Sequence, residues 1–144
     1  MLRLPILVML LLAPLACATA GAGAAGATRS GTLTFARADS LDLPAHDLVA
    51  VRAAPGGGII VLDGGPEGCG PITPWGTYVV DGSLVRVSLT GIDRVMVCRD
   101  AVTGPRRRYA ARLGGLAAGT YDVVFSFASE GAAWSPLRRT LIVP

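Results

Sequence analysis

The fold class is decided by residues 77–89, TYVVDGSLVRVSL, in the middle of the chain. Both ends of this stretch carry the β-branched, aromatic and aliphatic residues that strands favour. Between them stands Asp81-Gly82, a strong short signal for the tight turn of a β-hairpin. In the second half apolar and polar residues alternate, which places Val85, Val87 and Leu89 on one face of a strand. The stretch therefore predicts a β-hairpin with one buried face.

The same alternation continues on both sides of the hairpin, and no segment sustains a helical period. Further strands are predicted at 32–37, 48–53, 59–62, 94–99, 108–113, 120–127 and 137–143. Glycine and proline clusters separate them, and short strands between turn signals are typical of sandwiches and barrels. The prediction is an all-β, antiparallel β-sandwich of about 7–9 strands.

Residues 116–125, LAAGTYDVVF, resemble the tyrosine-corner segment of fibronectin type III and other immunoglobulin-like domains. There a leucine is followed, after a small turn with glycine or proline, by threonine, tyrosine and alternating apolar residues. The resemblance implies an immunoglobulin-like sandwich, as in exported bacterial proteins, whose corner Tyr121 caps through its hydroxyl. It also implies that Val123, Phe125 and Phe127 face the core. Such sandwiches host many functions, so the resemblance implies an architecture and no activity.

The chain opens on MLRLPILVMLLLAPLACATA, which has the three parts of an export signal. Arg3 supplies the positive start, residues 6–12 the apolar stretch and residues 18–20 a small-residue cleavage site. The stretch is too short and too weakly flanked to favour a membrane-spanning helix. The predicted organisation is a signal peptide at 1–20, a flexible glycine–alanine spacer at 21–30 and the β-sandwich domain at 31–144. The mature protein is expected to be secreted or periplasmic.

Residues 14–17, PLAC, resemble the lipobox of bacterial lipoproteins, in which a cysteine is lipidated and becomes the new N-terminus. Pro14 stands where that family favours leucine. The resemblance implies a membrane-anchored lipoprotein, and a membrane is a predicted partner only if Cys17 is lipidated. The alternative is that Cys17 is discarded with the signal peptide.

Without the leader, Cys69 and Cys98 remain as a pair. An even number of cysteines in an exported chain indicates a disulfide. The bridge would close a loop of about 30 residues and stabilise the fold by roughly 3–4 kcal/mol in the chain-entropy model. A two-thiol metal or redox site is the alternative, although one histidine cannot complete a usual zinc set. We expect the bridge to anchor a long, glycine-rich loop at 63–75.

The charged residues bear on the class of partner. The formal net charge of +3 at pH 7 is too small to imply nucleic-acid binding, and no nucleic-acid partner is predicted. The one concentrated cluster is Arg106, Arg107, Arg108 and Tyr109. Guanidinium groups bind carboxylates and phosphates through paired hydrogen bonds, so the cluster is a candidate site for an anion or an acidic partner. The alternative is a solvated loop that keeps the protein soluble.

Two tryptophans and one histidine complete the candidate residues. Trp75 and Trp134 lie beside prolines and are expected to cover the ends of the core, whereas exposure of both at one end would favour carbohydrate or protein binding. His46 is expected in an exposed loop. No Gly-x-Ser-x-Gly element accompanies it, so an enzyme or metal carrier centred on His46 is only a third hypothesis.

The predicted function is therefore that of an exported, non-catalytic β-sandwich, a binding or structural module of the cell envelope whose partner is an envelope protein or a glycan. No enzyme activity and no cofactor are predicted. The alternative is a secreted hydrolase inhibitor that acts through the disulfide-anchored loop at 63–75, since a pre-organised loop binds at lower entropic cost.

Overall fold

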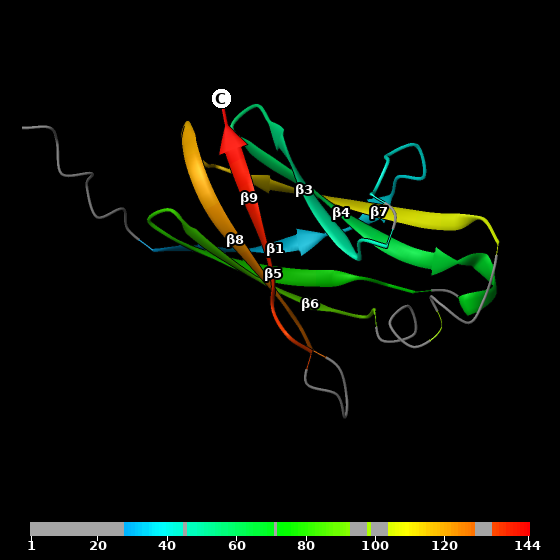
Figure 1. The fold of residues 1–144 in the computed structure, drawn as a ribbon. Coiled ribbons are helices and arrows are strands. Elements are labelled where there is room, and N and C mark those ends of the chain that lie inside the picture. Colours follow the sequence, from blue (N-terminus) through cyan, green and yellow to red (C-terminus); the bar gives the residue numbers. More distant parts are fainter. Residues whose placement is uncertain (1–27, 45, 71, 93–97, 99–103, 129–133) are drawn as a thin grey trace, which may run out of the picture.

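The computed structural model of this chain describes residues 28–44, 46–70, 72–92, 98, 104–128 and 134–144, without the side chain of Cys69. The predicted signal peptide, Cys17 and most of the predicted spacer lie outside these residues, as does most of the strand predicted at 94–99. The described part is built from strands that form two facing sheets (Figure 1).

Within the described ranges the strands are β1 (Arg29–Thr34), β2 (Ala36–Arg37), β3 (Val49–Ala54), β4 (Gly57–Pro66), β5 (Trp75–Asp81), β6 (Leu84–Thr90), β7 (Arg106–Gly114), β8 (Gly119–Phe127) and β9 (Leu137–Val143). One short 3-10 helix, η1 (Glu67–Cys69), follows β4. The five-stranded sheet has the order β1-β5-β6-β8-β9, and the four-stranded sheet has the order β2-β7-β4-β3. Two packed sheets of this kind confirm the predicted all-β sandwich.

One pair of neighbouring strands differs from the predicted antiparallel arrangement. β6 and β8 run parallel, with Val85 opposite Val123 and Val87 opposite Phe125. After β6 the chain crosses to the other sheet, forms β7 there and returns as β8. A parallel pair requires such a crossover connection, whereas antiparallel neighbours can be joined by a short turn.

The hairpin formed by β5 and β6 is confirmed. Asp81 pairs with Leu84 across the turn, and Gly82 adopts φ 57°, the left-handed backbone that such a turn requires. The alternation holds along β6: Val85, Val87 and Leu89 are fully buried, while Arg86 and Ser88 are exposed.

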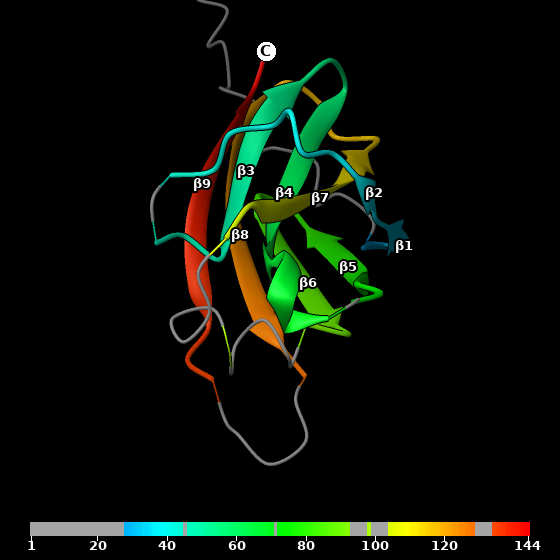
Figure 2. The same ribbon diagram turned by 90° about the vertical axis from the view of Figure 1, so that its right-hand side faces the viewer.

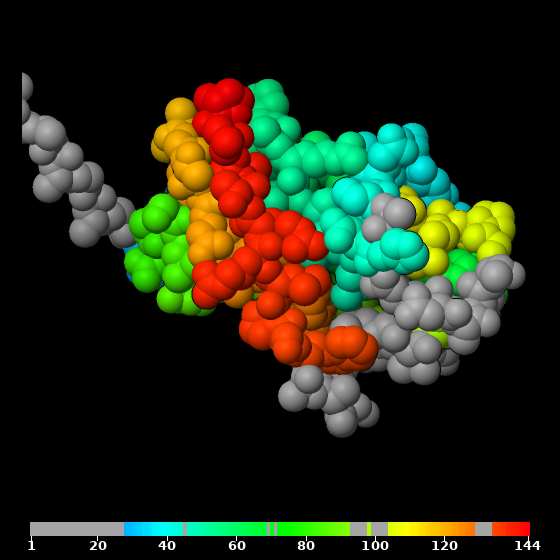
Figure 3. Space-filling model, viewed as in Figure 1, coloured from blue at the N-terminus to red at the C-terminus, as the bar shows by residue number. Residues whose placement is uncertain are grey.

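The core lies between the sheets, and residues from both sheets fill it. Its largest fully buried side chains include Phe125, Leu33, Ile60, Leu62, Leu89, Ile92, Leu113 and Leu141. Val123 and Phe127, which the resemblance placed in the core with Phe125, are buried as well. At one side of the sandwich β9 lies against β3 of the other sheet (Figure 3).

The outer faces of the two sheets differ in how far other parts of the chain cover them. Val61 lies on the outer face of β4, yet it is fully buried. The segment between β2 and β3 runs across this face (Figure 2), and it is bound there where the backbone N–H of Ala38 donates to the Arg108 carbonyl. The outer face of the five-stranded sheet carries exposed residues on each of its strands. The outer face of the four-stranded sheet is therefore covered around Val61, whereas its Arg52 and Arg112 are exposed, and the five-stranded sheet presents an open face.

Tyr121, near the start of β8, ties its strand to the turn that precedes it. Its hydroxyl donates a hydrogen bond to the carbonyl oxygen of Ala117 at 3.0 Å, four residues upstream. This bond, from a tyrosine back to the upstream backbone, is the one that the predicted tyrosine corner requires.

Replacing Tyr121 by phenylalanine is expected to lower the free energy of unfolding by about 1 kcal/mol, because the Ala117 carbonyl loses its partner. Urea unfolding followed by fluorescence measures the change. Tyr78→Phe is the matched control, since Tyr78 is a half-buried tyrosine of the same sheet whose hydroxyl makes no hydrogen bond in the described part of the chain. Equal effects of the two substitutions would contradict a specific role for the corner.

Candidate functional site

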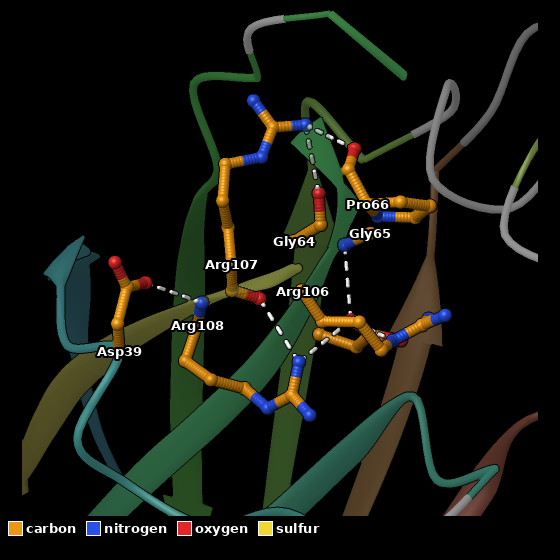
Figure 4. Close-up of polar contacts among 8 residues, drawn as sticks. Asp39, Gly64, Gly65, Pro66, Arg106, Arg107 and Arg108 are labelled. Atoms are coloured by element: carbon orange, nitrogen blue, oxygen red, sulfur yellow. Dashed lines mark hydrogen bonds and ion pairs between the residues drawn. The ribbon is translucent and has the colours of Figure 1, made fainter. Parts of the chain in front are cut away.

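The arginine cluster lies at the start of β7, where strand alternation separates its members. Arg107 points inward and is only 6% exposed, while Arg106 and Arg108 lie on the outer face of the sheet. The Nη2 atom of Arg107 donates to the carbonyl oxygens of Gly64 and Pro66, both at 3.1 Å (Figure 4). The cluster is part of a strand, so the alternative prediction of a solvated loop is wrong.

Asp63, near the end of β4, pairs with both outward arginines. It is 2% exposed and pairs with Nη2 of Arg106 and, at 3.2 Å, with Nη1 of Arg108. Its Oδ1 also accepts the backbone N–H of Gly65 at 2.9 Å. A buried carboxylate is tolerated only when it is paired and hydrogen-bonded in this way. The Asp63 cluster, as we call Asp63 with Arg106 and Arg108, therefore fastens β4 to β7.

The glycine-rich segment around Asp63 corrects the predicted loop at 63–75. Residues 63–66 belong to β4 and are buried, and the pairing of β4 with β7 shifts register between Asp63 and Pro66. A Cβ at Gly64 would lie 2.5 Å from the ring of Tyr109. Glycine is present at this position for close packing of a strand, which explains why the segment was mistaken for a loop.

A second group of charges lies beside the cluster. Asp39 accepts the backbone N–H of Arg108 at 2.9 Å and pairs with Arg37 at 2.6 Å. These bonds, the one from the Arg108 backbone first, hold the pKa of Asp39 below its usual value. Arg37 also pairs with Glu67 at 3.2 Å. The guanidinium groups here are engaged within the protein, and anion binding by Arg106, Arg107, Arg108 and Tyr109 stays a prediction.

Both tryptophans are exposed, so the prediction that they cover the core is wrong. Trp75 is 54% exposed and Trp134 is 43% exposed. Trp75 is the first residue of β5, and the two-residue period turns it to the outer face, while Gly76 faces inward. β5 and β9 run in the same direction and start at the same end of the sheet, so Trp134, just before β9, lies at the end where Trp75 lies.

Hydroxyl side chains surround Trp75 on the outer face of the five-stranded sheet. Thr34 of β1 and Thr90 of β6 are its partners on the two neighbouring strands. The adjacent row crosses four strands in register as Thr32, Thr77, Ser88 and Ser126. With neighbouring strands about 4.8 Å apart, this row spans about 14 Å. We call this surface the Trp75 face; it comprises Thr32, Thr34, Trp75, Thr77, Ser88, Thr90 and Ser126.

The charged side chains beyond the Trp75 face cancel one another. On the outer face of the same sheet Arg86 lies 3.8 Å from Asp81, and Arg138 lies 2.5 Å from Asp122. Between the two arginines stands the half-buried Val124. The described part of this face thus carries two arginines and two aspartates in internal pairs, and it has no net charge to select an ion.

The remaining candidate residues form no further site among the described residues. His46 is exposed, as predicted, with a left-handed backbone at φ 69°. No metal-binding group of three or more His, Cys, Asp or Glu residues was found in the described ranges. Cys98 is not a free thiol, but the side chain of Cys69 is outside the described part, so the Cys69–Cys98 bridge stays a prediction.

The chain matches no family model, no curated protein and no solved structure. Among the described residues no helix is both long and apolar enough to cross a membrane.

Proposed function

We propose that this chain is an exported, non-catalytic binding module of the cell envelope and that the Trp75 face is its binding surface. The observation that carries the proposal is the 54% exposure of Trp75 on an open sheet face. Exposing the large apolar ring of a tryptophan to water is unfavourable in free energy. Tryptophan is also over-represented among the residues that dominate binding energy. On the outer face of the other sheet, by contrast, Val61 is covered, and the exposed residues Arg52 and Arg112 are charged.

The proposal has three further supports. The leader at 1–20 favours export to the periplasm or the medium, with lipidation at Cys17 as the alternative. The bond from Tyr121 to the Ala117 carbonyl supports an immunoglobulin-like architecture, which commonly serves in recognition. The single histidine is exposed in a loop without a Gly-x-Ser-x-Gly element in the sequence, which favours a non-catalytic role.

The alternative function, a hydrolase inhibitor, has less support. It requires the segment 63–75 to stand out as a loop that fills an active site. Residues 63–66 are buried in β4 and tied to β7 through Asp63, so they are not available to a partner.

Export is tested by the intact mass of the protein purified from its native host, from soluble and membrane fractions. We expect a soluble species that starts at Gly21 and is lighter than its reduced form by the two hydrogens that a Cys69–Cys98 bridge removes. A membrane species that starts at lipidated Cys17 would make the module a surface lipoprotein and leave the binding surface unchanged. A soluble species that retains residues 1–20 would overturn export.

Binding is tested by retention of the domain on washed envelope fractions from the same host. Wild type is expected to be retained, and Trp75→Ala is expected to bind at least about tenfold more weakly. Ile142→Ala is the matched control, because Ile142 is a large apolar residue of the same sheet face that is 65% exposed and lies outside the Trp75 face. Equal retention of wild type and Trp75→Ala would overturn the assignment of the surface.

A further inference from the structure

We infer that the ligand of the Trp75 face is an uncharged polysaccharide chain, which lies across the strands with one sugar ring stacked on Trp75. This inference rests on the proposed function and specifies the class of its ligand. It is carried by the chemistry of the neighbours of Trp75, by the charge of the sheet face and by the length of its row of hydroxyl side chains.

The neighbours of Trp75 are hydroxyl side chains on every side that the sheet provides. Thr34 and Thr90 lie on the flanking strands, and Thr77 lies two residues along β5. The indole offers a flat apolar surface, which suits the C–H face of a sugar ring. Hydroxyl groups both donate and accept hydrogen bonds, as sugar hydroxyls do, so the same patch can meet both parts of a sugar.

The hydroxyls of the Trp75 face are only weakly engaged within the protein. The Oγ atoms of Ser88 and Ser126 are 3.3 Å apart, Ser126 Oγ donates to the Val87 carbonyl at 3.3 Å, and Thr90 Oγ1 donates to the Trp75 carbonyl at 3.4 Å. All three distances are long for a bond from a hydroxyl donor. A ligand hydroxyl can therefore take the place of these contacts, or of the water on them, without breaking a strong bond.

Charge favours a neutral ligand over an anionic one. The arginines on this face, Arg86 and Arg138, already pair with aspartates, and the residues of the Trp75 face are all uncharged. An anionic glycan would gain little electrostatic attraction here and would meet the carboxylates of Asp81 and Asp122. An uncharged chain loses nothing on a surface without net charge.

The surroundings of Trp75 favour a glycan over a protein. The centre of a protein interface is apolar, and its energetic anchors are aromatic and arginine side chains that lose their water on binding. Around Trp75 the surface is polar, and the row from Thr32 to Ser126 continues it over about 14 Å. An extended polar row of that length fits a short run of sugar units better than it fits the compact, apolar centre of a protein interface.

The test is affinity gel electrophoresis of the folded domain in gels that contain hydroxyethyl cellulose, galactomannan, soluble starch, a β-1,3-glucan or, as the anionic comparison, polygalacturonate. At least one neutral polymer is expected to retard wild type and Ile142→Ala. The apparent affinity of Trp75→Ala for that polymer is expected to be at least about tenfold lower than that of wild type. Trp75→Tyr is expected to recover part of the lost affinity. Retardation is expected to persist at high salt, because an uncharged ligand leaves no ionic contacts to screen.

The outcomes separate this inference from the function on which it rests. If no neutral polymer retards wild type, or if Trp75→Ala is retarded equally, the polysaccharide inference is overturned. Retention on envelope fractions that still depends on Trp75 would then leave the binding surface in place and point to an envelope protein. Binding to polygalacturonate alone, abolished by salt, would also overturn the inference. Unaltered urea unfolding of Trp75→Ala is the control for folding.

Discussion

Replacing Asp63 by alanine is expected to lower the free energy of unfolding by about 3 kcal/mol. Asp63 is 2% exposed and is the shared partner of Arg106 and Arg108. Without it, two guanidinium groups on one stretch of strand face each other with no carboxylate between them. The side chains of Arg106 and Arg108 are 34% and 16% exposed, so water can solvate them in part, which places the loss at the lower end of the range for buried pairs.

The measurement is urea unfolding at neutral pH, with Asp122→Ala as the matched control. Asp122 also pairs with an arginine, but its side chain is 48% exposed and that of Arg138 is 69% exposed. A surface pair of this kind contributes about 1 kcal/mol or less. Similar losses for the two substitutions would show that burial of Asp63 does not determine the strength of its pairs.

Asp63→Asn separates the two roles of Asp63, which are to pair with the arginines through its charge and to accept a backbone hydrogen bond. An asparagine can still accept the backbone N–H of Gly65, but it carries no charge for Arg106 and Arg108. If the charge dominates, the asparagine variant should lose most of what the alanine variant loses. If it instead unfolds like wild type, the carboxylate acts mainly as a hydrogen-bond acceptor for the register shift in β4.

The strands were predictable because the two-residue alternation is a local property of the sequence. β9 was placed at its observed bounds and β8 to within one residue, and the β5–β6 hairpin was identified by its turn. Each of these segments buries one face, so a shift by one residue would expose its apolar side chains. The parallel pairing of β6 with β8 carries no local signal, since it depends on which sheet the chain joins after β6.

The Asp63 cluster was not predictable, because it too depends on which strands become neighbours. Asp63 and Arg106 are separated by 43 residues, and neither residue alone signals a partner at that distance. The glycines beside Asp63 have two readings from sequence, a loop or a closely packed strand, and only the ring of Tyr109 against Gly64 decides between them. A buried aspartate in a glycine-rich stretch and a run of arginines are complementary once β4 and β7 are known to be neighbours.

The Trp75 face could have been found from the sequence. Residues 30, 32 and 34 of the chain are Ser, Thr and Thr, and residues 88 and 90 are Ser and Thr, each set at the period that gives a strand one polar face. If the first strand of the predicted hairpin is extended back from Thr77 to Trp75, the two-residue period places Trp75 on the same face as Thr77. The prediction for Trp75 is wrong because the adjacent proline indicates a loop, whereas the strand begins at Trp75 itself.

The second large effect is expected from Gly57→Ala, at the other end of the β4–β7 pairing. A Cβ at Gly57 would overlap the carbonyl oxygen of Leu113, which belongs to the backbone of β7 and cannot turn away as a side chain can. Gly57 also has φ 156°, where alanine is strained. Overlap and strain together are expected to lower the free energy of unfolding by about 3–5 kcal/mol in urea titrations.

The neighbouring Gly56 provides the control that separates overlap from strain. It too has a positive φ, 67°, but a Cβ there would meet no atom within 4 Å. Gly56→Ala therefore carries only the left-handed strain of about 1–2 kcal/mol, offset in part by the lower entropy of the unfolded chain. If Gly57→Ala costs no more than Gly56→Ala, the β4–β7 pairing can separate at this end without loss, and the stability of the four-stranded sheet must reside at the Asp63 end. If it costs several times more, both ends of this pairing are needed to hold the sandwich together.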